Sequence, residues 1–142
     1  MSDPSIRGRL RTPAWLWGPV ALQMALIFAA SSIPDLQGLP GGMSDKSGHG
    51  LGYALLGAVL LRALAGGRLV GITWGRAAAA IGLATLYGAS DEIHQAFVPG
   101  RSPDAFDVLA DCLGATAAVV AGGVARWWGI LEFPPFRGGP QS

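Results

Sequence analysis

The sequence predicts an all-α transmembrane bundle of about four helices, and three observations lead to this expectation. The mean hydropathy is +0.41 and only 13% of the 142 residues are charged, a composition far from that of a water-soluble surface. The chain contains 22 glycines, and small residues let helices pack closely inside a bilayer. Four apolar segments each reach the roughly 20 residues that a membrane crossing requires.

The first apolar segment, residues 15–30, lies in a stretch without charge between Arg11 and Asp35. Its length fits a membrane-spanning helix. The alternative is a cleaved signal peptide, because three arginines precede the segment and small residues at 29–32 would offer a cleavage site. The apolar run is long for a signal peptide, which favours the spanning helix.

Three further segments are long enough to cross a membrane, but each is interrupted by charge. They are residues 49–66, 77–97 and 105–131. Their apolar portions alone would also suit core helices of a soluble protein. Four spans would use about 80 residues, however, which leaves no room for a separate soluble domain.

We therefore expect one transmembrane domain over residues 14–131. A basic cytoplasmic tail at residues 1–13 precedes it, and a disordered tail at residues 132–142 follows it. On a four-helix map, the two tails and the loop near residues 67–76 share one side and carry eight basic residues against two acidic ones, a net +6. The opposite side carries seven acidic residues against two basic ones, a net −5.

This charge asymmetry predicts that both termini are cytoplasmic, because basic residues in short loops stay in the cytoplasm. All five tryptophans fall at the same predicted ends, where an aromatic belt would lie: Trp15, Trp17, Trp74, Trp127 and Trp128. The total net charge of +1 argues against a nucleic-acid partner. The single cysteine, Cys112, excludes an internal disulfide and a thiolate zinc cluster.

Polar residues gather at the predicted outer ends of the last three segments. In the first group, Lys46, His49 and Tyr53 follow at helical spacing and form one face, with Asp45 beside them. An ordinary helix start explains Asp45 and Lys46. It explains His49 and Tyr53 less well, because both enter the apolar segment and need partners there.

The second group is Asp91, Glu92, His94 and Gln95, which follow an uncharged run. If the helix continues to residue 97, the two carboxylates lie inside its end and are functional candidates. The alternative is that the helix stops near Ser90 and the group forms a solvated loop.

The third group begins at a short turn in which Ser102 is expected to cap the next helix and Pro103 to take its first position. One stripe of that helix then runs from acidic to small residues: Asp104, Asp107, Asp111, Gly114 and Ala118. Small residues favour close helix packing, so the stripe is expected to face the bundle.

Because a short loop joins the last two helices, their polar ends are expected to meet in a pocket. Arg101 is predicted to point back toward the acids. Structural ion pairing and ligand binding are both open explanations of such a cluster.

Three ordered motif blocks complete the sequence evidence. They are Asp45-Lys46-x-x-His49-x-x-x-Tyr53, then Glu92-x-x-Gln95-x-Phe97-x-Pro99-x-Arg101, then Asp107-x-x-x-Asp111-x-x-Gly114. With them the chain resembles the VanZ-like family of small bacterial membrane proteins over about residues 20–125. The one departure is Asp111, where the family usually has asparagine. The resemblance implies a multi-pass protein of the bacterial cytoplasmic membrane, and it links the family's founding member to resistance against the glycopeptide teicoplanin.

The sequence leaves three functions open. The leading hypothesis is a cell-envelope protein whose outward-facing pocket binds an anionic or polar ligand, such as a lipid head group, a cell-wall precursor or a glycopeptide-related molecule. The alternative is a membrane-embedded hydrolase or transferase acting on a lipid-linked or phosphorylated substrate, with or without a divalent ion. A proton- or ion-coupled carrier ranks last, because the predicted cytoplasmic halves hold no acid or histidine.

Ten residues are candidates for the site. The expected catalytic centre is His49, Glu92 and Asp107. The expected ligand-binding residues are Asp45, Lys46, Tyr53, Asp91, Gln95, Arg101 and Asp111. The sequence names no cofactor and no oligomeric state; membrane lipids are the expected partners.

Overall fold

The computed structural model describes residues 13–34 and 45–128, which form four α-helices, one short 3-10 helix and no strand. The helices are α2 (Pro13–Ser31), α3 (Asp45–Leu64), α4 (Trp74–Gln95) and α5 (Ala105–Trp127), with η1 (Leu69–Gly71) between α3 and α4. The predicted all-α fold with four helices is confirmed. The expected tails lie outside the described residues, apart from Pro13 at the start of α2.

One alternative is excluded, and one local expectation is wrong. The helix that contains Asp91 does not stop near Ser90, because α4 continues to Gln95. The N-cap of α5 is Asp104 rather than Ser102, and its carboxylate accepts a hydrogen bond of 2.9 Å from the backbone N–H of Phe106. An aspartate directly before the helix satisfies an N–H of the first turn, which leaves Ser102 and Pro103 in the preceding loop.

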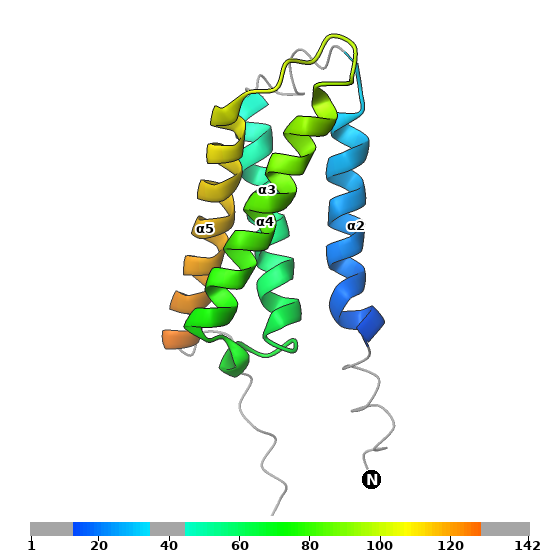
Figure 1. Cartoon of the computed structure of the whole chain (residues 1–142). Coiled ribbons are helices and arrows are strands. Elements are labelled where there is room, and N and C mark those ends of the chain that lie inside the picture. Colours follow the sequence, from blue (N-terminus) through cyan, green and yellow to red (C-terminus); the bar gives the residue numbers. More distant parts are fainter. Residues whose placement is uncertain (1–12, 35–44, 129–142) are drawn as a thin grey trace, which may run out of the picture.

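Consecutive helices run in opposite directions, as Figure 1 shows. The ends of α2 and α4 therefore lie beside the starts of α3 and α5, at one end of the bundle. This arrangement brings the polar residues at these four helix ends together in one layer.

The most extensive helix contact is between α3 and α5, and it depends on small residues. A side-chain carbon added to Gly114 would collide with the backbone carbonyl of Gly50. One added to Gly57 would come within 2.8 Å of the Cα of Ala115. The two helices thus approach to backbone contact, and the prediction that the small stripe faces the bundle is confirmed.

The outer surface of the bundle is apolar. Two helices, α2 and α5, are long and apolar enough to span a membrane. Small side chains such as Ala80, Ala84 and Ala115 are fully buried. Large apolar side chains are exposed on every helix, among them Leu22, Leu55, Leu86 and Leu113. Small buried residues between the helices and a leucine-rich exterior suit a surface in contact with lipid tails.

The five tryptophans lie at the other end of the bundle from the polar layer. Trp15 and Trp17 begin α2, Trp74 begins α4, and Trp127 and Trp128 end α5; all five are exposed. Arginines at this end bind backbone carbonyls: Arg62 donates to Trp15 and Arg126 donates to Ile72. The structure thus separates an aromatic, basic end from a polar, acidic one.

Candidate functional site

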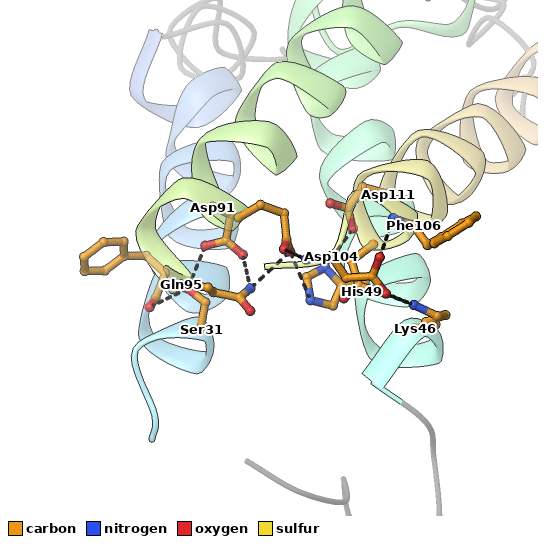
Figure 2. Close-up of polar contacts among 11 residues, drawn as sticks. Ser31, Lys46, His49, Asp91, Gln95, Asp104, Phe106 and Asp111 are labelled. Atoms are coloured by element: carbon orange, nitrogen blue, oxygen red, sulfur yellow. Dashed lines mark hydrogen bonds and ion pairs between the residues drawn. The ribbon is translucent and has the colours of Figure 1, made fainter. Parts of the chain in front are cut away.

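A continuous network of polar contacts crosses the acidic end of the bundle from α2 to α5 (Figure 2). Its members come from all four helices and from the loop before α5. In order across the bundle they are Ser31, Asp91, Gln95, Glu92, His49, Asp111, Asp104, Lys46 and Asp107.

The first part of the network joins α2 to α4. The hydroxyl of Ser31 donates a 2.6 Å hydrogen bond to Asp91 Oδ1, and the amide of Gln95 donates to Asp91 Oδ2 at 3.2 Å. The same amide lies 3.4 Å from Glu92 Oε1. Gln95 therefore links two carboxylates whose side chains leave the helix about 100° apart, since successive helical residues are separated by that angle.

The centre of the network is His49. Its Nδ1 lies 3.1 Å from Asp111 Oδ1, and its Nε2 lies 3.9 Å from Glu92 Oε1. The side chains of His49 and Glu92 are each 8% exposed, and that of Asp111 is fully buried. The second oxygen of Asp111 has no hydrogen-bond partner among the described residues, so His49 is its carboxylate's main polar contact.

Lys46 forms the outer edge of the network. Its ammonium group lies 2.6 Å from Asp104 Oδ2 and 3.0 Å from Asp107 Oδ1. The hydrogen bond from Lys46 holds the pKa of Asp104 below its ordinary value, and the bond from the Phe106 N–H acts in the same direction. Lys46 is thus already engaged by two carboxylates.

The loop before α5 connects to the network at the acidic end of the bundle. The backbone N–H of Asp104 donates a 2.8 Å hydrogen bond to Glu92 Oε2. This bond ties the end of α4 to the start of α5 and fixes one oxygen of Glu92, which directs the other toward His49.

The three residues expected to form the centre of the site do converge. His49, Glu92 and Asp107 come from α3, α4 and α5, and each offers a ligand atom within 4.8 Å of the others. This geometry suits an imidazole and two carboxylates acting on one bound group. Their catalytic role stays a prediction.

A cavity of about 250 Å³ lies beside this centre, between α2, α3 and α4. Its apolar wall includes Leu26, Ile27, Ala30, Gly48 and Gly52, and its polar wall includes Gln23, Ser31, His49, Tyr53, Asp91, Gln95 and Arg101. Arg101 thus lines the same cavity as Asp91, and its predicted contact with the acidic residues stays a prediction.

Tyr53 is the most deeply placed polar residue on the cavity wall. The residue is 1% exposed, and its hydroxyl has no hydrogen-bond partner among the described residues. Its ring lies parallel to that of His49 at a centroid distance of 6.2 Å. A buried hydroxyl without a partner is costly unless a ligand or water supplies one.

Sequence reasoning missed two polar members of the cavity wall. Gln23 and Ser31 lie at the inner face of α2, where Gln23 donates to the backbone carbonyl of Gly52. The available signal was that both are polar residues on an otherwise apolar spanning helix. His94, by contrast, makes its contacts outside the network. It stacks on Phe28, and it lies 3.0 Å from the hydroxyl of Ser32.

Of the ten predicted site residues, nine have described side chains. Seven of these lie in the network, while Tyr53 and Arg101 line the adjoining cavity. The side chain of Asp45 lies outside the described part of the structure.

Comparisons with known proteins give one match. Neither the curated proteins nor the solved structures contain a relative that matches the chain. A family model, VanZ/LLP1, matches residues 44–126, which contain α3, α4, all of α5 except Trp127, and every polar network residue except Ser31. With helices of membrane-spanning length and polar residues from each of the three motif blocks in one network, the chain belongs to the VanZ/LLP1 family.

Proposed function

We propose that this protein spans the bacterial cytoplasmic membrane with four helices and binds the anionic head group of a lipid-linked envelope molecule in its polar cavity. The observation that carries the proposal is the buried hydroxyl of Tyr53, which faces the cavity without a partner among the described residues. A ligand oxygen in the cavity would satisfy it.

The walls of the cavity favour an amphiphile. Leu26, Ile27 and Ala30 of α2 supply an apolar side, while Ser31, Gln95 and Arg101 supply polar groups at its end. A molecule with a polar head and an apolar tail matches both surfaces. Leu26 is more than half exposed on the outside of the bundle. The apolar tail of a ligand in the cavity would therefore extend along α2 into the surrounding lipid.

Arg101 determines the preferred charge of the head group. It is the side chain with a permanent positive charge among the described residues that line the cavity. Lys46, the other basic residue at this end, is 54% exposed and engaged by Asp104 and Asp107. Arginine binds phosphate and carboxylate oxygens through paired N–H groups, so we expect an anionic head group against Arg101.

Binding can be measured by calorimetry on the purified protein in detergent, with short-chain phosphatidate as the anionic probe and short-chain phosphatidylcholine as the zwitterionic one. We expect phosphatidate to bind more tightly. Replacing Arg101 with glutamine should weaken this binding by about tenfold or more, because charge-assisted hydrogen bonds are lost. Replacing Tyr53 with phenylalanine should weaken it by roughly twofold to tenfold.

The matched control is Arg68→Gln, which removes an exposed arginine before η1, at the other end of the bundle. It should leave phosphatidate binding unchanged. Equal affinities for Arg101→Gln and the unmodified protein would contradict the proposal.

The topology follows from the two ends of the bundle. The acidic end, with the loop between α4 and α5, faces the outside, and the tryptophan-rich end faces the cytoplasm. In a Cys112→Ser background, a cysteine at the exposed Ser102 should react with a membrane-impermeant maleimide on intact cells. A cysteine at the exposed Val70, beside α4, should react only after lysis. The reverse labelling pattern would place the polar cavity on the cytoplasmic side.

A second candidate function is a hydrolase or transferase acting on a phosphorylated envelope lipid. The convergence of His49, Glu92 and Asp107 beside the cavity favours it. Release of inorganic phosphate from short-chain phosphatidate, abolished by Glu92→Gln, would establish a phosphatase. Binding without turnover would leave the protein as a binding module.

A further inference from the structure

We propose that His49, Glu92 and Asp107 bind one divalent first-row metal ion, such as Zn²⁺ or Mn²⁺, at the acidic end of the bundle. The proposed site lies beside the cavity and does not depend on the head group proposed there. An imidazole nitrogen with two carboxylates is a donor set that such ions accept.

The spacing of the donor atoms suits one ion. The three side chains offer atoms that lie within 4.8 Å of one another. Atoms bound to one such ion at about 2.1 Å are separated by roughly 3 to 4 Å. Small side-chain rotations would therefore bring all three to bonding distance, with no movement of the helices.

The orientation of the histidine suits a metal ligand. Its Nδ1 lies at hydrogen-bond distance from Asp111 Oδ1, and in the neutral tautomer that donates to this oxygen the lone pair is on Nε2. Metal-binding histidines commonly donate their second nitrogen to a carboxylate in this way. Asp111, fully buried behind the ring, would act as the positioning residue.

The Nε2 atom of His49 faces the carboxylate of Glu92. Its contact is Glu92 Oε1 at 3.9 Å, which is too long for a hydrogen bond. The His49 side chain is 8% exposed and lines the cavity, so the gap is largely enclosed by protein. An acceptor nitrogen facing carboxylate oxygens in a buried space leaves room for a cation between them.

The surrounding contacts leave the required oxygens available. Glu92 uses Oε2 to accept the N–H of Asp104, while Oε1 faces His49. Asp107 meets Lys46 through Oδ1, and a carboxylate has a second oxygen with its own lone pairs. Lys46 balances part of the negative charge of Asp104 and Asp107 and does not enter the space between the three donors.

The test uses the full chain, purified in detergent and treated with a chelator that is then removed. Calorimetry with Zn²⁺ and with Mn²⁺ should show one ion bound per chain. Pulsed EPR of the Mn²⁺-loaded protein should show coupling to one histidine nitrogen, a result that requires no variant. Glu92→Gln and Asp107→Asn should each weaken binding by at least about tenfold.

The matched control is Asp104→Asn, which neutralises a neighbouring carboxylate that contacts Lys46 but lies outside the donor set. It should leave affinity nearly unchanged, while Asp111→Asn should weaken binding through the loss of the carboxylate behind His49. Circular dichroism confirms that each variant is folded. Absence of binding tighter than about 1 mM for both ions would overturn the proposal. Bound Mn²⁺ without nitrogen coupling, or equal losses for Asp104→Asn and Asp107→Asn, would also overturn it.

Discussion

Replacing Gly114 with alanine is expected to destabilise the bundle by about 1 to 3 kcal/mol or more, the usual range for overpacking a tight contact. The added methyl group would collide with the backbone carbonyl of Gly50 on α3. Neither partner is the flexible end of a side chain, so α3 and α5 would have to separate along their most extensive contact.

The matched control is Gly123→Ala on the same helix. A methyl group there meets no atom within 4 Å, and alanine favours a helix over glycine by up to about 1 kcal/mol. We expect Gly123→Ala to be neutral or stabilising. The measurement is the free energy of unfolding of both variants in detergent. Similar losses for the two variants would mean that general effects of alanine, rather than the α3–α5 contact, determine the result.

The second large effect is expected for His49→Ala. Asp111 is fully buried, and one of its oxygens already lacks a partner among the described residues. Removing the imidazole would leave this carboxylate without its 3.1 Å contact. Breaking a buried ionic pair by removing one partner typically costs about 3 to 5 kcal/mol.

A second substitution, at Asp111, tests the cause of the stability lost in His49→Ala. Asp111→Asn removes the buried charge and keeps an oxygen that accepts from His49. We expect Asp111→Asn alone to be tolerated. The double variant His49→Ala with Asp111→Asn should be more stable than His49→Ala alone, because no buried charge remains unpaired.

His94→Ala is the control for the loss of a histidine ring. His94 is partly buried, stacks on Phe28 and contacts Ser32 rather than a carboxylate. The decrease in the free energy of unfolding for His94→Ala should be clearly smaller than the decrease for His49→Ala in the same unfolding experiment. Equal losses, or a double variant no more stable than His49→Ala, would show that burial of charge on Asp111 is not the controlling term.

The helices and the polar end were predictable because both depend on local composition. Runs of apolar residues predicted four helices, and helical spacing placed Lys46, His49 and Tyr53 on one face. The short link between α4 and α5 required their ends to meet. These arguments need only the period of a helix and the length of a loop.

The partners within the network were not predictable in the same way. Helical spacing did not show that His94 would contact Phe28 and Ser32 instead of joining the carboxylate network. The cap of α5 moved to Asp104, whose backbone N–H binds Glu92. These contacts depend on how each helix is rotated about its axis. The helical period of the sequence does not determine that rotation.

The sequence by itself determined an all-α membrane protein with one acidic end and one aromatic, basic end, because hydropathy and charge are properties of segments. Only the tertiary structure decided that Asp111 holds His49 toward Glu92 and that a cavity opens beside Tyr53. The physical reason is distance. Side chains on three helices meet within a few ångströms because Gly57 and Gly114 let α3 and α5 approach to backbone contact.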